Sequence, residues 1–307
     1  MAARADAASS APLPYQAGRS GEMAAEMGAP APRNDPAKAR QRPLPEPRRL
    51  TSHGPARVIA MCNQKGGVGK TTSTINLGAA LAEHGRKVLL IDLDPQGALS
   101  VGLGVPMHTL DRTIYNVLME RRTTLTDVRV PTSVPNLDLV PSNIDLSAAE
   151  VQLVSEVARE QTLLRVLAEV RDEYDYVLID CQPSLGLLTV NALTAAQGVI
   201  IPLECEFFSL RGVALLVDTI DKVKERLNPA LEVDGILATM YDARTVHCRE
   251  VFSRVVEAFG DTVFQTVITR TVRFPETTVA GQPITTWAPT SIGAAAYRDL
   301  AKEVLAL

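Results

Sequence analysis

A glycine-rich stretch that ends in Lys-Thr-Thr constrains the fold of this chain more than any other feature of its sequence. Residues Asn63–Thr72 read Asn-Gln-Lys-Gly-Gly-Val-Gly-Lys-Thr-Thr. They follow an apolar run, Val58–Cys62, that predicts a buried strand, and they lead into a helical pattern over Lys70–His84 that ends at Gly85. A strand, a glycine-rich turn and a helix in this order are the context that a phosphate-binding loop requires.

The residue types of this loop indicate which ligands it binds. Glycines let backbone N–H groups turn toward an anion, and the helix N-terminus adds a favourable dipole. Lys70 is placed to reach the β and γ phosphates, and the Thr71 hydroxyl to ligate Mg²⁺. The usual pattern begins with glycine where this chain has Gln64, and an additional lysine, Lys65, follows instead. We therefore predict the phosphate groups of a nucleotide and Mg²⁺ as ligands, with contacts from Lys65, Gly66, Gly67, Val68, Gly69, Lys70, Thr71 and Thr72.

Short apolar runs alternate with longer helical patterns along the rest of the chain. Further strands are expected at Lys87–Ile91, Tyr176–Ile179, Gly198–Leu203, Gly235–Met240 and Val263–Ile268. Helices are expected near Gln161–Asp172, Leu210–Leu227 and Arg249–Phe259. This alternation predicts an α/β fold with a doubly wound, mostly parallel sheet and helices on both faces.

The N-terminal segment differs from the rest in composition and charge. Residues 1–50 contain eight Lys/Arg and five Asp/Glu, a net charge of +3, so residues 51–307 carry −4 − 3 = −7. Because it is rich in Ala, Pro and Arg and has few large apolar groups to bury, we predict a disordered arm over residues 1–55. Residues 56–307 are then one α/β domain. The arm is either a basic contact to nucleic acid or a partner, or a solvated tail.

Composition excludes several other classes. The chain is 46% hydrophobic, and no stretch reaches the ~18–20 apolar residues of a membrane span. No basic-then-apolar leader begins it, which argues against secretion. The four cysteines lie far apart and form no CxxC pair, so a disulfide framework and a structural zinc site lose support and a reduced compartment fits best. These cysteines are Cys62, Cys181, Cys205 and Cys248.

The loop together with several later segments resembles a known family. The stretch Lys65–Thr72 resembles the deviant Walker A motif of the ParA/MinD class of ATPases, and from Val58 onward the chain is most similar to the ParA/Soj chromosome- and plasmid-partitioning ATPases. The supporting segments, in chain order, are Asp92–Gly97, Asp180–Ser184, Thr239–Asp242, and Ala288–Ser291 with Gly293 and Tyr297.

The resemblance implies specific roles for charged residues. Lys65 would reach across a nucleotide-sandwich homodimer to the partner's phosphates, and a second cation there would neutralise charge spreading over the transferred phosphoryl oxygens. Asp94 would orient the attacking water, so Lys65 and Asp94 are the predicted catalytic residues, while the role of Asp92, the other carboxylate at this strand end, is less defined.

Asp180 follows an apolar strand, which is the setting of a Walker B carboxylate. Two residues later this chain has Gln182, where the family usually has proline. The predicted magnesium ligands are Thr71, Asp94 and Asp180. For each aspartate the alternative is a residue that caps the turn after its strand.

Base and DNA contacts are also implied by the resemblance. Thr269 and Thr271 replace the proline and asparagine of a family segment associated with the adenine, and Met240 is a further candidate there, the alternative being a core methionine. For DNA, Arg270 and Arg273 are the principal candidates. Weaker candidates are Arg244, Arg249 and Arg254, and solvated surface residues are the alternative for all five.

The function implied is a slow Mg²⁺-dependent ATPase in the cytoplasm, associated with the nucleoid. Its ATP-bound dimer would bind duplex DNA non-specifically, and a ParB-like partner would stimulate its release. The main alternative is a MinD-like ATPase on a membrane or protein array, which needs a basic amphipathic C-terminal helix. Residues 297–305 have helical apolar spacing, but Arg298 and Lys302 are balanced by Asp299 and Glu303, so a core-packing helix is predicted.

Three other classes were weighed. An iron–sulfur carrier would need a second cysteine near Cys181, and none is evident in the sequence. A biosynthetic ligase is possible on this fold, but no residue indicates a substrate. A non-catalytic ATP-sensing scaffold is opposed by Asp94.

Overall fold

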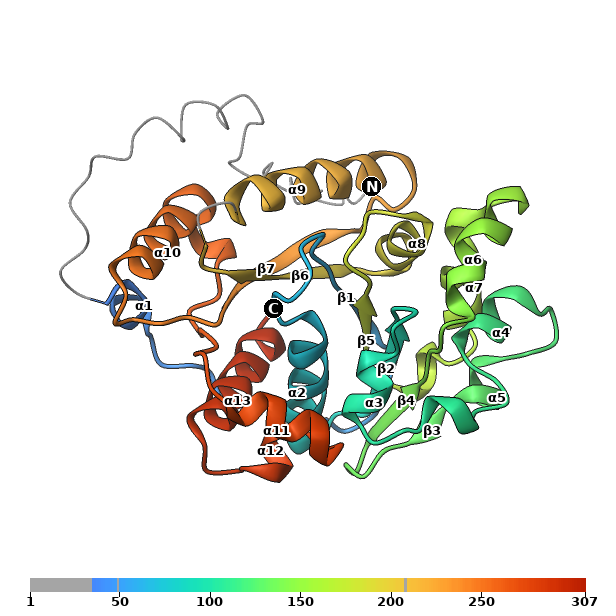
Figure 1. Cartoon of the computed structure of the whole chain (residues 1–307), viewed down its shortest axis with the longest axis horizontal. Helices are drawn as coiled ribbons and strands as arrows, with labels where there is room; N and C mark the ends of the chain where they lie inside the picture. Colours follow the sequence, from blue (N-terminus) through green and yellow to red (C-terminus); the bar gives the residue numbers. More distant parts are fainter. Residues whose placement is uncertain (1–34, 49, 207–208) are drawn as a thin grey trace, which may run out of the picture.

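A seven-stranded sheet forms the centre of the computed structural model, which describes residues 35–48, 50–206 and 209–307 (Figure 1). The strand order is β3-β4-β2-β5-β1-β6-β7, and the pairs are parallel except β3–β4. The strands are β1 Arg57–Met61, β2 Val88–Leu93, β3 Val130–Pro131, β4 Leu137–Val140, β5 Tyr176–Cys181, β6 Gly198–Glu204 and β7 Glu232–Thr239. The predicted α/β fold with a doubly wound sheet is confirmed.

Helices cover both faces of this sheet. In chain order they are α1 Pro36–Arg40, α2 Lys70–Glu83, α3 Ala98–Gly102, α4 Ile114–Met119, α5 Leu125–Val128, α6 Leu146–Gln152, α7 Thr162–Leu167, α8 Leu187–Ala195, α9 Ser209–Arg226, α10 Val246–Phe259, α11 Arg273–Ala280, α12 Ile284–Trp287 and α13 Ile292–Leu305. In Figure 1, α8 and α9 lie on one side of the sheet, and α2 and α13 on the other.

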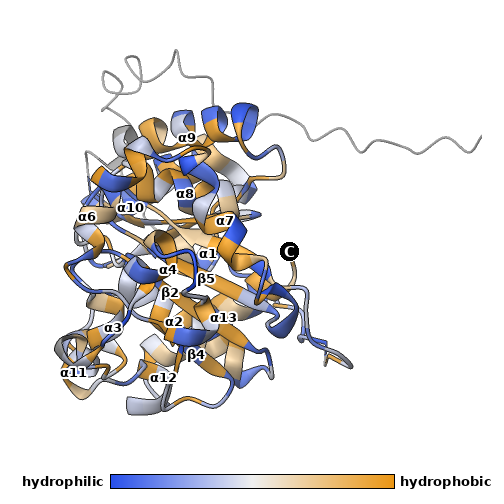
Figure 2. Cartoon of the chain, turned by 90° about the vertical axis from the view of Figure 1, so that its right-hand side faces the viewer, coloured by the Kyte–Doolittle hydropathy of each residue, from blue (hydrophilic) through white to orange (hydrophobic). Residues whose placement is uncertain are grey.

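Side chains along each strand point alternately to the two faces of the sheet, so the hydrophobic core is divided into two parts, one on each face. In β1, Val58 and Ala60 pack with the α8–α9 side, whereas Ile59 and Met61 pack with α2 and α13. Both faces are buried because helices cover both, so the strands are almost wholly apolar. Figure 2 shows this: the inner strands β2 and β5 are largely hydrophobic, whereas α9 mixes hydrophilic and hydrophobic residues.

The predicted strand Val263–Ile268 is wrong, although this segment does run beside β7. It makes only isolated bridges, Ile236 with Val263 and Tyr241 with Thr269. Between them, the backbone N–H groups of Gln265 and Thr266 donate to the Glu303 carboxylate of α13, at 2.9 Å each. These donors are therefore not available to continue a ladder with β7.

Two short strands were missed, and one helix is shorter than predicted. β3 and β4 have two and four residues, too few for a clear alternation of apolar and polar positions. The helix expected at Gln161–Asp172 contains only one α-helical segment, α7, with short 3₁₀ turns at Arg159–Gln161 and Arg171–Glu173.

Part of the segment expected to be a disordered arm packs on the domain from residue 35 onward. Ala37 is buried, and the Asp35 carboxylate accepts a hydrogen bond from the Tyr241 hydroxyl at 2.6 Å. Arg40 donates to the carbonyls of Gly260 and Val263, at 3.2 and 2.8 Å. Polar side chains hold this segment, which is why its low apolar content did not reveal the contact. Residues 1–34 of the predicted arm lie outside the described residues.

Removal of the Arg40 side chain tests this docking. Arg40→Ala is expected to lower the free energy of unfolding by about 1.5–3 kcal/mol, because two hydrogen bonds from a charged group to carbonyls are lost. The measurement is urea denaturation of the full chain, with Lys38→Ala on the exposed side of α1 as the control. Equal midpoints for Arg40→Ala and the parent chain would contradict the contact.

Candidate nucleotide-binding site

The glycine-rich loop joins β1 to α2, and three polar contacts hold it in shape. The Asn63 amide donates to the Pro202 carbonyl at 2.7 Å, and its oxygen accepts from the Lys65 N–H at 2.9 Å. The Thr239 hydroxyl, at the end of β7, donates to the Val68 carbonyl at 2.8 Å. Gly69 precedes α2 with φ +86°, a left-handed conformation that favours glycine. The loop is therefore braced by the ends of β6 and β7.

Open space lies where this loop would receive an anion. A Cβ added at Gly67, whose φ is +75°, would meet no atom within 4 Å, and one at Gly66 would meet only Pro183, at 4.0 Å. The N-terminus of α2 follows directly and has no side-chain cap. Uncapped N–H groups beside an open glycine turn fit a phosphate group.

Lys70 is a cation held in the interior of this site. Its side chain is buried, and its Nζ donates to the Lys65 carbonyl at 3.1 Å. Burial lowers the pKa of Lys70, and the charge of Asp180 opposes that shift only in part. Because the charged form is disfavoured in the ligand-free chain, a phosphate brought against it would relieve the penalty.

Thr71 and Asp180 meet at the ends of α2 and β5. The Thr71 hydroxyl donates to Asp180 Oδ2 at 2.6 Å. Burial, and secondarily the charge of Asp92, raise the pKa of Asp180 to about 8. A hydroxyl and a carboxylate are oxygen ligands of the type that Mg²⁺ prefers, and a cation would offset the cost of burying this carboxylate. These two residues therefore fit a magnesium site.

The two carboxylates at the end of β2 behave differently. Asp92 is fully buried, and one of its oxygens accepts from the backbone N–H and the hydroxyl of Ser100, at 2.9 and 2.7 Å. Burial raises its pKa to about 7. Asp94 is partly exposed and accepts from the Gln96 N–H at 2.9 Å. Asp92 therefore anchors α3, while Asp94 caps its own turn in this ligand-free structure.

Substitution of Asp180 is expected to stabilise the ligand-free chain. A pKa raised from 3.8 to about 8 means that the folded state binds the proton more tightly than the unfolded state. Stability through this group therefore falls as pH rises from about 4 to about 8. In the absence of Mg²⁺, Asp180→Asn should raise Tm at pH 8. It should have little effect at pH 4, because the side chain at position 180 is then uncharged in the folded state of both the parent chain and the variant. Thermal unfolding at the two pH values measures this, and a lower Tm at pH 8 would contradict it.

Lys65 lies at the mouth of the loop, between two carboxylates that the sequence analysis did not select. Its Nζ contacts Glu204 at 3.1 Å and Glu206 at 2.5 Å, and its side chain is 42% exposed. Burial opposes the charged form, but the hydrogen bonds to Glu206 and Glu204 raise the pKa of Lys65 overall. The sequence signal was present: a Glu-Cys-Glu triplet at the end of a predicted strand, at the sheet edge where α/β proteins bind ligands.

Two of the three predicted adenine contacts lie beside the end of β7. Thr269 bridges to Tyr241, and Met240, with φ +51°, directly follows the strand that braces the loop. Thr271 instead accepts a hydrogen bond from the N–H of Arg273 at 3.2 Å, which places it at the start of α11.

The two principal DNA candidates lie in this same segment, and both are exposed. The side chain of Arg270 is 67% exposed and contacts Glu204 at 3.0 Å, and that of Arg273 is 57% exposed and contacts Glu276 at 3.1 Å. Arg244 is 90% exposed and pairs with Asp242 at 2.8 Å. Each of these three arginines is therefore partly neutralised by an acidic neighbour.

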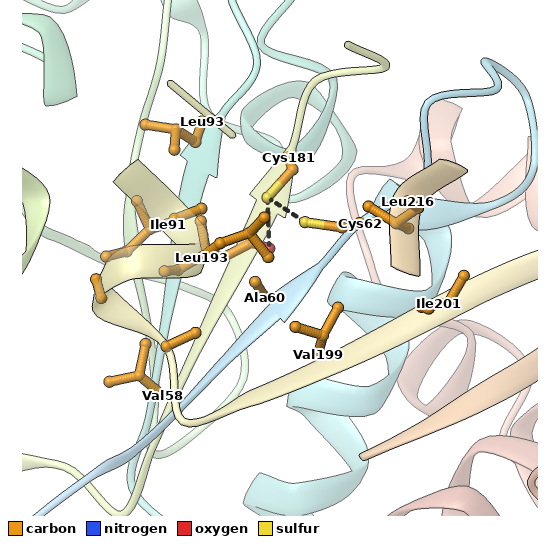
Figure 3. Packing of buried hydrophobic residues seen from close by; sticks show 14 of the residues in the cluster. Val58, Ala60, Cys62, Ile91, Leu93, Cys181, Leu193, Val199, Ile201 and Leu216 are labelled. Carbon is orange, nitrogen blue, oxygen red and sulfur yellow. Dashed lines mark hydrogen bonds between the residues drawn. The ribbon is translucent and has the colours of Figure 1, made fainter. Parts of the chain in front are cut away.

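Cys181 does have a cysteine neighbour, contrary to the expectation from sequence. Cys62, at the end of β1, lies with its Sγ 3.0 Å from that of Cys181, at the end of β5 (Figure 3). The two strands are parallel neighbours in register, which brings residues 119 positions apart together. Both side chains are 1% exposed, so neither is placed to bridge a cluster between subunits. Among the described residues, no group of three or more His, Cys, Asp or Glu could hold a metal ion.

Comparisons with known proteins find a matching family model, similar sequences and similar structures. A family model described as an AAA domain matches residues 56–233. Soj of Bacillus subtilis, a sporulation initiation inhibitor protein, is 47% identical over 250 residues, 81% of this chain and 98% of that protein. The chromosome partitioning protein ParA of Caulobacter vibrioides is 47% identical over 256 residues, 83% and 96% of the two chains. A crystal structure of cobyrinic acid a,c-diamide synthase from Mycobacterium smegmatis, with ADP and magnesium, has a TM-score of 0.71 and 42% identity, covering 80% of this chain and 92% of that chain.

Proposed function

Because the chain belongs to the ParA/Soj family of chromosome-partitioning ATPases, we propose that its ATP-bound form is a homodimer that binds duplex DNA without sequence preference. A ParB-like partner stimulates hydrolysis and so releases the protein from DNA. The protein acts in the cytoplasm on the nucleoid, as a switch that positions a chromosome, a plasmid or another cargo.

The chain is an ATP hydrolase of the P-loop class, and ATP and Mg²⁺ are its ligands. In our proposal Lys70 and the N–H groups of the loop hold the β and γ phosphates, while Thr71 and Asp180 hold the metal, which neutralises phosphate charge when bound. Asp94, partly exposed at the end of β2, leaves its turn to orient the attacking water and contributes to the metal site. The buried Asp92 keeps that turn in place through Ser100.

The position of Lys65 is the observation that carries this proposal. A second lysine at the outer edge of the loop, half exposed and held by Glu204 and Glu206 rather than by the loop itself, is not needed to bind a nucleotide within one chain. When it leaves these two carboxylates and turns outward, it reaches the phosphates of a second copy. ATP then stabilises the dimer, and hydrolysis removes the charge that holds it together.

Exposed arginines on neighbouring loops support DNA binding. The turn after β7, with Arg244, and the segment with Arg270 and Arg273 are brought together by the Tyr241–Thr269 bridge. A dimer doubles this surface, which compensates for the net charge of −7 on residues 51–307. Each phosphate that an arginine neutralises makes binding weaker at high salt.

The membrane-associated alternative is less well supported. No helix in the described part of the chain is long and apolar enough to cross a bilayer. The apolar side of α13 is already occupied: Tyr297, Leu300 and Val304 are buried against the α2 side of the sheet. A C-terminal helix that docks reversibly on lipid needs this side to be free.

The experiment is binding of the purified chain to random duplex DNA with Mg²⁺ and ATP, ADP or no nucleotide, over a salt series. We expect binding only with ATP and a negative slope of log K against log salt. Arg270→Ala and Arg273→Ala should each weaken binding to all sequences and reduce the slope by about 1, whereas Arg165→Ala on α7 should not. An ATP dimer that does not bind DNA at low salt would contradict the proposal and favour a membrane or protein-array surface.

A further inference from the structure

The carboxylate of Glu204 binds two cations that have separate roles in the proposed function. Its Oε2 accepts a hydrogen bond from Lys65 Nζ at 3.1 Å, and its Oε1 accepts one from Arg270 Nη2 at 3.0 Å. Glu204 is the last residue of β6, and Lys65 lies in the glycine-rich loop. Arg270 follows Thr269, which bridges to Tyr241 beyond the end of β7. Three distant segments therefore meet at one side chain.

This carboxylate is enclosed, whereas its two cationic partners are not. The side chain of Glu204 is 13% exposed, and those of Lys65 and Arg270 are 42% and 67% exposed. A carboxylate that has lost most of its hydration depends on the cations beside it. The two long side chains, in contrast, can rotate into solvent, where their charges are well hydrated. Glu204 is therefore the fixed member of this cluster, and Lys65 and Arg270 are the members that can leave it.

A second carboxylate, that of Glu206, belongs to the cluster on one side only. It contacts Lys65 Nζ at 2.5 Å and is 56% exposed. In the described part of the chain it forms no ion pair with Arg270, whose acidic partner is Glu204. The four side chains carry two positive and two negative charges at neutral pH. If either cation leaves, two carboxylates and one cation remain.

We propose that Glu204 is a shared counter-ion through which the departure of Lys65 and the departure of Arg270 oppose each other. When Lys65 turns toward the phosphates of a second copy, the whole charge of Glu204 acts on Arg270. When Arg270 moves to a phosphate of DNA, the whole charge of Glu204 acts on Lys65. Coupling between two binding equilibria is reciprocal. Dimer formation and DNA binding through Arg270 therefore each weaken the other.

This coupling deepens the proposed function and rests on it, because it limits how tightly the ATP-bound dimer binds DNA. Arg270 contributes to DNA affinity, but it returns readily to a carboxylate that Lys65 has left. Arg273 provides the comparison. Its partner, Glu276, lies three residues later on α11 and forms no ion pair with a second cation among the described residues. Binding of Arg273 to DNA is therefore independent of Lys65.

The first test measures the cluster in the full chain without nucleotide or DNA. Its readout is the acetylation rate of Lys65 at about pH 9, where only the minor uncharged form reacts; Lys222 on α9 is the internal reference. Arg270→Ala should slow this rate about 1.5- to 5-fold, because Glu204 then holds Lys65 alone and favours its charged form. Glu204→Gln should raise the rate.

A matched variant separates this contact from a general change in charge. Arg273→Ala removes the same charge from a pair outside the cluster, so it should leave the acetylation rate of Lys65 unchanged. Equal rates in the parent chain and in Arg270→Ala would overturn the shared counter-ion, whether or not the protein binds DNA.

The second test compares the affinity of the ATP-bound dimer for random duplex DNA in two variants. Glu204→Gln should bind about 1.5- to 5-fold more tightly than Glu206→Gln, which removes the same charge two residues away but leaves the contact with Arg270. The gain should disappear when Glu204→Gln is combined with Arg270→Ala. Equal affinities in the two single variants would overturn the coupling and leave the proposed function intact. A dimer that binds no DNA in any variant would instead contradict the proposed function.

Discussion

Lys70→Ala is expected to weaken ATP binding by about 30- to 4,000-fold. The loss of one partner from a buried, hydrogen-bonded charge pair costs about 2–5 kcal/mol, and each 1.4 kcal/mol is a factor of ten in affinity. Lys70 is buried beside the open turn at Gly66 and Gly67, so water cannot replace its ammonium group in the contact with phosphate. ATP affinity, measured by calorimetry with Mg²⁺, is the quantity to compare.

The same substitution should not destabilise the ligand-free chain. Burial lowers the pKa of Lys70, so its charged form weakens the folded state wherever the unfolded lysine is charged, and Tm without nucleotide should stay the same or rise. Lys70→Met keeps most of the apolar stem and separates loss of charge from loss of packing. Lys222→Ala, on the exposed side of α9, is the control. Parental affinity in Lys70→Ala would remove the basis for the phosphate site.

Asp94→Ala is expected to keep ATP binding and lower the hydrolysis rate by about 10²–10⁴-fold, which is the usual contribution of a positioned acid–base or water-orienting group. The Asp94 carboxylate makes no contact that supports the glycine-rich loop; it accepts a hydrogen bond from the N–H of Gln96 in its own turn. The ATP dimer should therefore form and persist. Single-turnover hydrolysis and size-exclusion chromatography with ATP measure the two effects.

Two controls make this prediction specific. Asp261→Ala removes an exposed aspartate from a 3₁₀ turn far along the chain and should change neither measurement. Asp92→Asn keeps the contact with Ser100 and removes a buried charge, so it should leave the turn in place. If Asp94→Ala hydrolyses ATP at the parental rate, another group orients the water and the role of Asp94 is refuted.

The sequence predicted the nucleotide loop because every element of that site is local. Asn63–Thr72 form one continuous turn between one strand and one helix, and the glycine conformations, the helix N-terminus and Lys70 all follow from order along the chain. The central strands were equally predictable, because burial on both faces leaves a continuous apolar run. Short elements, such as β3 and β4, have too few residues for such a pattern.

Features built from distant segments could be decided only by the tertiary structure. Glu204 and Glu206 contact Lys65 from 139 and 141 residues away, and Arg40 reaches the end of α10 across more than 200 residues. The Cys62–Cys181 pair arises in the same way, from two neighbouring parallel strands. Periodicity and motif spacing carry information about a residue's own strand or helix. Which strand ends meet at the sheet edge depends on strand order, and this order is set by how the helices cover the two faces of the sheet.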